Sequence, residues 1–381
     1  MHIPAVVMRG GTSKALFFHE KDLPVDPALR DAFILAAMGS PDPYRRQIDG
    51  LGGAVSTTSK VAIIGDGTAY GVDVTYEFGQ VSLDQPLVDR RSNCGNISSA
   101  VGPFAVDEGL VEATDPVTLV RFLNLNTNKV IVAHVPTRNG RFDPIGDFEL
   151  AGVPGRASRV QMDFVSPGGA VTGRLLPTGS VVDELTLPGL GTIPVSIVDA
   201  ANPLVFVRWE DLGLTGLEVP AQVDADPALL ARIESVRAQA SVLAGITATV
   251  EEATREAPSV PKLSLVGAPR EYVATNGLTV RAEESSVRAM MMSMGRVHNS
   301  YPLTGAIATA VAANVPGTLV HDVASPDDGE FVIGHPAGLL VMTADVEHDG
   351  TEWRANSASG FRTSRRLMEG QVLVPDERLA V

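Results

Sequence analysis

Two side chains in the first hundred residues have the types needed for acid–base chemistry, a thiol and an amine. Cys94 is the one cysteine among 381 residues, and it stands in "NCGN" just before a run of small apolar residues. This context predicts that Cys94 begins a helix, whose positive end favours a thiolate. An inert buried cysteine is the common alternative, but the flanking Asn93, Gly95 and Asn96 are typical of loops and helix caps.

The amine is Lys60, which ends "GGAVSTTSK" and opens the strand-like "VAIIG". A lysine at the start of a strand is usually a solvated end. Here the Gly-Gly pair and the hydroxyls of Ser56, Thr57 and Ser59 instead predict a polar pocket. A lysine in that pocket would pair with a substrate carboxylate or, if desolvated, act as a general base.

Other segments are candidates for binding a carboxylate. The segment "MRGGTSKA" (8–15) lacks the spacing of a phosphate loop, so we expect it to bind carboxylates rather than a nucleotide. The three turns at 177–180, 199–203 and 335–338 are equally well explained as ordinary turns or as binding segments. The candidate binding residues in these segments are Arg9, Gly10, Gly11, Thr12, Ser13, Lys14, Thr178, Gly179 and Asn202.

Composition limits the class of protein. A net charge of −15 argues against a nucleic-acid partner, and 44% hydrophobic residues over this length suggest two domains. A single cysteine excludes an internal disulfide and fits a reducing compartment. Neither a signal-peptide layout nor an apolar run long enough to span a membrane is present. We therefore expect a cytoplasmic protein with a small anionic substrate and no membrane partner, and a homodimer remains open.

The histidines show no metal-ligand spacing, and no dinucleotide-binding fingerprint occurs. We therefore expect neither a metal nor a cofactor. A thiol and an amine without a cofactor indicate proton transfer at a carbon made acidic by conjugation, which is the chemistry of isomerases and racemases.

The elements that must position these groups are both strands and helices, which predicts an α+β fold. Amphipathic helices are expected at 26–39 and 226–246, each opened by Asp-Pro. Segments 96–106 and 304–315 are apolar on every side, which predicts two fully buried helices. Strand-like alternation occurs at 60–65, 70–83, 129–136, 193–200, 203–209 and 339–346.

Three matches in the same order suggest a duplication. Residues 12–18 resemble 201–207, residues 59–65 resemble 261–267, and residues 94–101 resemble 304–311. The boundary is expected near residue 185, giving domains 1–185 and 186–381. Cys94 then corresponds to Thr304, followed by Gly305, and a cleft between the domains would bring both helix N-termini to one anionic substrate.

The motifs "MRGGTSK", "QIDGLGGAVSTTSK", "FGQVSLDQPLVD", "NCGN" and "RRLMEG" together resemble the PrpF family, over residues 6 to about 374. That family is similar in fold to diaminopimelate epimerase. The resemblance implies a duplicated fold in which each domain is a barrel-like sheet around a central helix. It also implies an active site in the cleft between the domains, and it leaves room for the last strand to cross back to the first domain.

The resemblance implies a cofactor-independent isomerase that moves a proton across an allylic unit of an unsaturated tricarboxylate. Lys60 and Cys94 match the catalytic residues of the family, and Thr304 replaces the second cysteine of related epimerases. We favour a 2-methylaconitate cis–trans isomerase of propionate catabolism. The alternatives are a 4-oxalomesaconate tautomerase, a methylitaconate isomerase, and a non-catalytic carboxylate-binding accessory to a dehydratase. Which of Lys60 and Cys94 is the base stays open.

Overall fold

The computed structural model describes residues 1–187, 191–324 and 331–379. The chain forms two compact units, one made of Met1–Met162 with Arg362–Val381 and the other of Asp163–Phe361. This division differs from the boundary expected near residue 185. The reason is that the segment before β12 (Asp183–Leu187) is already bonded to β13 (Gly191–Ala200) of unit 2: Gly168 bridges Ala200, the Val171 amide donates to Asp199, and the Val181 carbonyl accepts from Ser196.

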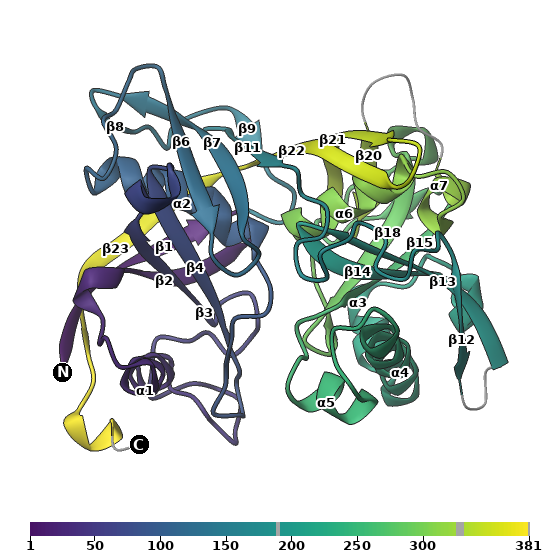
Figure 1. Ribbon diagram of the computed structural model, residues 1–381, viewed down its shortest axis with the longest axis horizontal. Coiled ribbons are helices and arrows are strands. Elements are labelled where there is room, and N and C mark those ends of the chain that lie inside the picture. Colours follow the sequence, from purple (N-terminus) through teal and green to yellow (C-terminus); the bar gives the residue numbers. More distant parts are fainter. Residues whose placement is uncertain (188–190, 325–330, 380–381) are drawn as a thin grey trace. The chain divides into compact units, whose positions relative to one another are not determined.

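Unit 1 is built on a mixed sheet in the spatial order β23–β1–β2–β3–β4–β6–β7 (Figure 1). The β2–β3 and β4–β6 pairs are parallel and the others are antiparallel. A short strand β5 (Val88–Asp89) also pairs with the end of β4. The strands are β1 (His2–Gly10), β2 (Ser13–His19), β3 (Lys60–Asp66), β4 (Val74–Val81), β6 (Val117–Asn124), β7 (Lys129–Arg138) and β23 (Ser364–Leu373).

Two helices cover opposite faces of this sheet. Helix α2 (Gly95–Asp107) is buried from Gly95 to Val106, and its Phe104 ring lies 5.4 Å from that of Phe17 on β2. Helix α1 (Pro27–Met38), capped by Asp26, packs on the other face of the sheet. It contacts Leu16 and Phe18, which stand on either side of Phe17 on β2. Because side chains alternate across a strand, each residue of β1, β2 and β3 faces either α2 or α1.

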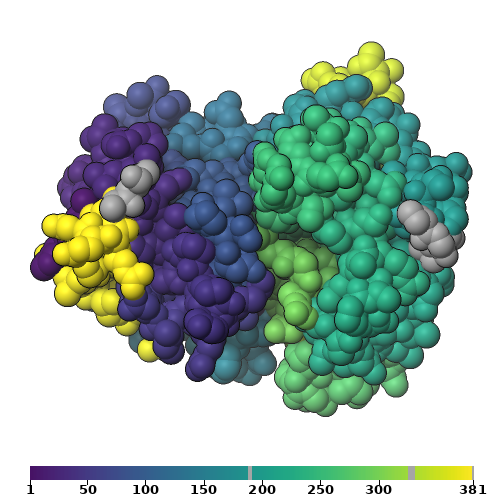
Figure 2. All heavy atoms as spheres, turned by 90° about the horizontal axis from the view of Figure 1, so that it is seen from below, coloured from purple at the N-terminus to yellow at the C-terminus, as the bar shows by residue number. Residues whose placement is uncertain are grey.

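The C-terminal segment completes unit 1. Strand β23 pairs with β1 along its whole length, from Gly10↔Ser364 to His2↔Leu373. The amino terminus of Met1 lies 2.9 Å from an Asp376 carboxylate oxygen. Figure 2 shows these C-terminal residues in yellow against the purple N-terminal ones. Residues far apart in the sequence therefore lie side by side in this unit.

Unit 2 has a sheet in the order β12–β13–β14–β15–β18–β20–β21–β22, with β14–β15 and β18–β20 parallel. Helix α6 (Leu303–Ala313) is buried at every residue. Helix α4 (Pro227–Leu243) packs on the hydrophobic cluster of the opposite face. The strands are β14 (Asn202–Arg208), β15 (Lys262–Gly267), β18 (Val287–Ser293), β20 (Phe331–His335), β21 (Gly338–His348) and β22 (Trp353–Arg362).

The remaining elements are short. They include α3 (Pro220–Asp224), α5 (Val250–Arg255), α7 (Leu319–Val323), β8 (Arg141–Phe142), β9 (Phe148–Glu149), β10 (Arg156–Ala157), β11 (Val160–Val165), β16 (Tyr272–Val273), β17 (Thr279–Val280) and β19 (Arg296–Val297). In the described ranges no helix is long and apolar enough to cross a membrane.

The two units repeat one topology. Strands β1, β2, β3, β4, β6 and β7 correspond to β13, β14, β15, β18, β20 and β21, with the same parallel and antiparallel pairings. The buried helix lies in the same place in each, α2 between β4 and β6 and α6 between β18 and β20. The α+β class is confirmed, and the three sequence matches fall on β2/β14, β3/β15 and α2/α6.

Candidate active site

Lys60 is the first residue of β3, on the face of the sheet that α2 covers. Its neighbour Val61 belongs to the cluster packed on α1, so alternation turns the Lys60 side chain the other way. Lys60 is only 6% exposed. Its Nζ donates a hydrogen bond to Oε1 of Gln80, its register partner on β4. Lys60 is therefore a buried amine rather than a solvated strand end.

Gln80 also organises the loop before Lys60. Its Nε2 donates to the carbonyl oxygens of Ser56 (3.2 Å) and Ser59 (3.0 Å). The Ser59 hydroxyl lies 2.6 Å from Oε1 of the buried Gln47 and 3.0 Å from the Val55 carbonyl oxygen, and its one proton can be donated to either acceptor. In the structure the Ser59 hydroxyl holds the loop together, and its expected contact with a substrate stays a prediction.

The burial of Lys60 changes its acidity. Desolvation lowers the pKa of the Lys60 ammonium below its usual value of 10.5, and the negative charge of a Cys94 thiolate opposes this effect. The two groups are thus electrostatically coupled. A buried ammonium with a lowered pKa is a better acid than a solvated lysine, and its acidity depends on the charge of Cys94.

Cys94 is the N-cap residue of α2, as the sequence predicts. It is 9% exposed and unpaired with another cysteine, and its side chain makes no capping hydrogen bond. Its carbonyl accepts from the Ser98 amide (2.8 Å), and the Ser98 hydroxyl donates to Oδ1 of Asn93 (3.0 Å). The thiol therefore stands at the positive end of a buried helix dipole, held by its backbone and its neighbours.

The two glycines of "RGGTSK" allow the β1–β2 hairpin to approach this helix end. A Cβ atom on Gly10 would collide with the Asn96 carbonyl oxygen, and one on Gly11 would collide with the Asn96 side chain. Gly11 also has φ +51°, in the left-handed region that favours glycine. Ser13, which follows on β2, is buried, and its hydroxyl has no hydrogen-bond partner.

Asn96, in the first turn of α2, joins the hairpin to the end of β22. Its Nδ2 donates to the Thr12 hydroxyl (3.0 Å), and its Oδ1 accepts from Nε of Arg362 (2.9 Å). Arg362 is 1% exposed. Burial lowers its pKa to about 9, and a Cys94 thiolate opposes that change. Arg362 therefore remains a cation at neutral pH, within electrostatic reach of the thiol.

The structure does not bring Arg9 and Lys14 to this group. They are register partners on β1 and β2, next to Gly10 and Ser13, so alternation puts both side chains on the face opposite α2. Nη1 of Arg9 donates to the carbonyl oxygens of Gly11 and Thr363, both at 2.9 Å. The nearby cation that sequence reasoning missed is instead Arg362.

Unit 2 carries its own buried polar groups at the matching position. Thr304, the second residue of α6 after the N-cap Pro302, is 1% exposed, and its hydroxyl has no partner. Asn202 starts β14 and is fully buried, with neither amide atom hydrogen-bonded. Unpartnered buried groups of this kind are costly and usually mark a ligand or water site. Gly305 is explained by packing, because a Cβ there would collide with Met291.

Thr178 and Gly179 form a local turn. The Thr178 hydroxyl donates to Asp183 (2.8 Å) and accepts from the Ser180 amide (3.2 Å), while Gly179 closes the turn at φ +82°. Here the ordinary-turn interpretation explains both residues. The Thr178 hydroxyl is already used within the turn.

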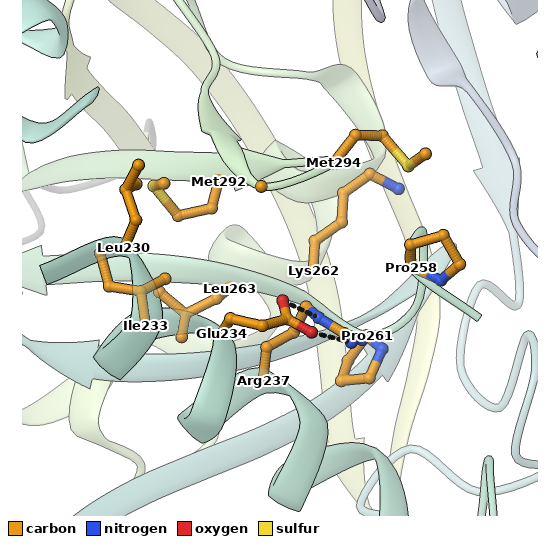
Figure 3. Close-up of a pocket in the computed structure, with 11 residues that line it drawn as sticks. Leu230, Ile233, Glu234, Arg237, Pro258, Pro261, Lys262, Leu263, Met292 and Met294 are labelled. Carbon is orange, nitrogen blue, oxygen red and sulfur yellow. Dashed lines mark hydrogen bonds and ion pairs between the residues drawn. The ribbon is translucent and has the colours of Figure 1, made fainter. Parts of the chain in front are cut away.

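A cavity of about 20 Å³ lies in unit 2, between α4 and the ends of β15 and β18 (Figure 3). Its volume is large enough for about one water molecule. Its Arg237 guanidinium is engaged by Glu234 and by the carbonyl oxygens of Ala253, Ala257 and Val260. Lys262, which corresponds to Lys60 in the sequence repeat, also lines this cavity. The cavity is too small for a tricarboxylate.

Sequence reasoning missed Gln80, Tyr76 and Arg362. The sequence contains only a weak indication of Gln80. It is a polar residue within the predicted strand 70–83, and antiparallel pairing of that strand with 60–65 places it beside Lys60. Tyr76 is fully buried on β4. Burial raises its pKa well above 10, and a Cys94 thiolate raises it further, so its phenol stays protonated. No local pattern in the sequence indicates Arg362, since it reaches the start of α2 only because β23 returns to pair with β1.

Comparison with known proteins gives a consistent result. The family model described as PrpF protein matches residues 1–375. A 3-methylitaconate isomerase from Eubacterium barkeri is 44% identical, covering 100% of this chain and 99% of its own. A 2-methyl-aconitate isomerase from Shewanella oneidensis is 41% identical, covering 98% of this chain and 97% of its own.

Among solved structures, a methylitaconate-delta-isomerase matches with a TM-score of 0.80 and 43% identity, covering 100% of this chain and 97% of its own. A hydroxyproline epimerase from Agrobacterium vitis matches with a TM-score of 0.57 at 13% identity, covering 99% of this chain and 94% of its own. This second likeness concerns the fold alone, and it supports the epimerase-like architecture.

Proposed function

Because the chain belongs to the PrpF family and is an isomerase, we propose that it moves a proton across the allylic unit of an unsaturated polycarboxylate. The observation that carries this proposal is geometric: the buried amine of Lys60 lies on the face of the sheet covered by α2, the buried helix that begins after Cys94. A thiolate and an ammonium in one buried site form an acid–base pair without any added group.

Cys94 acts as the base in this proposal. Its thiolate takes a proton from the carbon at one end of the allyl unit, and the electron pair of that C–H bond shifts the double bond. Lys60 gives its proton to the carbon at the other end. One C–H bond breaks and one forms, and the thiol returns its proton to the amine through solvent.

The coupling orders these two steps. The thiolate raises the pKa of Lys60 and so holds the proton on the amine. Once Cys94 accepts a proton, that effect ends, and burial alone acts to lower the pKa of Lys60. Lys60 then releases its proton at the moment the delocalised carbanion needs it. Rotation in that carbanion also interconverts cis and trans isomers.

The carboxylates of the substrate need their own partners. We propose that the free N–H groups at the start of α2 bind one of them. Within unit 2, the buried and unpartnered Asn202 amide and Thr304 hydroxyl are suited to bind a carboxylate. Each would gain the hydrogen bonds it lacks in the free protein.

Among substrates we propose 2-methylaconitate, in agreement with the named activity of the Shewanella oneidensis relative. The identity of 44% to a 3-methylitaconate isomerase supports that dicarboxylate as a second candidate. Both offer a carbon acid next to a conjugated carboxylate. The free thiol required by this chemistry persists in a reducing compartment, so we place the protein in the cytoplasm.

The test is a panel of 2-methyl-cis-aconitate, 3-methylitaconate, 4-oxalomesaconate and cis-aconitate, followed by ultraviolet absorbance and proton NMR. We expect the highest kcat/KM for 2-methyl-cis-aconitate. Turnover of 3-methylitaconate alone would move the assignment to the second candidate. Binding of all four acids without any turnover would contradict an isomerase and support an accessory carboxylate-binding role.

A further inference from the structure

Gln47 lies buried in the loop that connects α1 to β3, and no part of the proposed reaction yet uses it. It is 1% exposed, and its backbone has φ +48°, in the left-handed region that a residue with a side chain seldom adopts. A Cβ atom on Gly52 would collide with the Gln47 side chain, so the loop closes tightly around it. A buried amide at a strained backbone position indicates a specific task for this residue.

The contacts of the Gln47 amide fix its orientation. Its Nε2 donates to the Ser40 hydroxyl, and its Oε1 accepts from the Ala54 amide, both at 2.9 Å. Because a backbone N–H only donates, the oxygen must face Ala54. The Ser59 hydroxyl lies 2.6 Å from the same oxygen, which has a second lone pair to accept its proton. Gln47 thus connects the loop to the residue just before Lys60.

A second amide connects Ser59 to the amine. Nε2 of Gln80 donates to the carbonyl oxygens of Ser56 (3.2 Å) and Ser59 (3.0 Å). Both partners only accept, so the Gln80 oxygen must face the other way, where it accepts from Nζ of Lys60. Gln47, Ser59 and Gln80 therefore form one continuous path of contacts from the loop to the Lys60 amine.

In unit 2 the corresponding lysine is held differently. Nζ of Lys262 donates to the carbonyl oxygen of Ser259 (3.3 Å). Leu263 pairs with Met292, so Ser293 takes the place on β18 that Gln80 takes on β4. The repeated topology therefore does not require a glutamine there, and the link from Gln80 to Gln47 belongs to the unit that also holds Cys94.

We propose that Gln47 is a positioning residue that acts through Ser59 and Gln80 to hold the Lys60 amine at the place where it delivers its proton. A lysine side chain is a flexible four-carbon stem, so its amine has a fixed position only if its end is held. A displacement of about 1 Å at a reacting group can cost about 10²-fold in rate. This inference rests on the proposed role of Lys60 as the acid, and it adds the residue that fixes the position of that acid.

The experiment measures kcat and KM with 2-methyl-cis-aconitate, or with 3-methylitaconate if that is the acid turned over, in wild type, Q47M and S59A. We expect Q47M to lower kcat by roughly 10- to 100-fold and to leave KM within about twofold, because the amine moves while the carboxylate partners stay in place. S59A should do the same, since it removes the hydroxyl between the two amides. The thermal midpoint checks that each variant is folded at the assay temperature.

S40A is the matched control. It removes the other hydroxyl that contacts the Gln47 amide, on the branch that does not lead to Lys60. We expect S40A to keep the wild-type kcat, even if its thermal midpoint falls.

A double variant separates positioning from a merely structural role. In a K60M background, Q47M should cause no further fall in kcat, because no amine is left to position. A general disturbance of the site would lower kcat by the same factor with and without Lys60.

Two results would overturn the inference. One is an unchanged kcat in Q47M and S59A, and the other is an equal fold-loss from Q47M in the wild-type and K60M backgrounds. Should Q47M not fold, S59A and the S59A/K60M double variant decide the question. A wild-type kcat in K60M would refute the proposed acid and this inference together. A loss in K60M without a loss in Q47M and S59A would overturn this inference alone.

Discussion

Arg362 Nε donates a 2.9 Å hydrogen bond to Asn96 Oδ1, although 266 positions separate the two residues in the sequence. Asn96 uses its other end to hold Thr12 at the tip of the β1–β2 hairpin. One asparagine side chain thus connects the hairpin, the helix that begins after Cys94 and the end of β22. The proposed base is held by three segments that the sequence separates widely.

Removal of the Lys60 amine tests the proposed acid. We expect K60M to lower kcat by about 10²–10⁴-fold, the usual contribution of one acid–base group. K262M is the matched control, since Lys262 holds the corresponding place in the second repeat. It should keep wild-type kcat in a steady-state assay, and an equal loss in both variants would contradict a special role for Lys60.

The Gln80 contact predicts a shift of pH dependence. Lys60 must be protonated to act as the acid, so kcat should fall as the pH rises through its pKa, which lies below 10.5. In Q80E a carboxylate replaces the amide beside the ammonium and favours the charged form. The alkaline limb of a pH–rate profile should therefore move to higher pH. A kcat that instead rises as the pH passes through the pKa of Lys60, with this rising limb at higher pH in Q80E, would show that Lys60 works as the neutral amine.

Replacing Asn202 should weaken substrate binding without lowering the stability of the ligand-free protein. Both of its amide atoms are buried without a partner, which costs about 1–3 kcal/mol per group. We expect N202L to leave the thermal midpoint of the ligand-free protein unchanged or to raise it, while KM increases at least tenfold. A lower midpoint with an unchanged KM would show that Asn202 has a structural role only.

Substitution of Gly11, at the tip of the β1–β2 hairpin, should lower the free energy of unfolding. G11A adds a methyl group where the Asn96 and Arg362 side chains already lie, at a left-handed backbone position. We expect a loss of about 1–3 kcal/mol in urea unfolding. G140A is the control, because Gly140 is also left-handed, at φ +73°, but has open space around it. G140A should lose less, and equal losses would mean that backbone strain alone decides the effect.

The sequence predicts the secondary structure well where periodicity is strong. The helices opened by Asp26 and Asp226, and the two helices apolar on every face, lie where expected. Local patterns decide these elements, because burial and capping act within a few residues. The duplication could be predicted for the same reason, since equivalent strands and helices need similar residues.

The candidate site could be predicted only in part. Lys60 and Cys94 stand in distinctive motifs, but the face of each strand depends on register. Register puts Arg9 and Lys14 opposite α2 and turns Lys60 toward it. Arg362 reaches the site because β23 returns to β1 across almost the whole chain, a long-range pairing that local sequence does not encode.

The most direct measurement of the central claim is proton NMR of 2-methyl-cis-aconitate and 3-methylitaconate incubated with the protein in D2O. We expect deuterium at the allylic carbon of the substrate that is turned over, at full rate in wild type and K262M. In C94S and K60M we expect the exchange rate to fall by about 10²-fold or more. Full exchange and turnover in both C94S and K60M would contradict the Lys60–Cys94 pair.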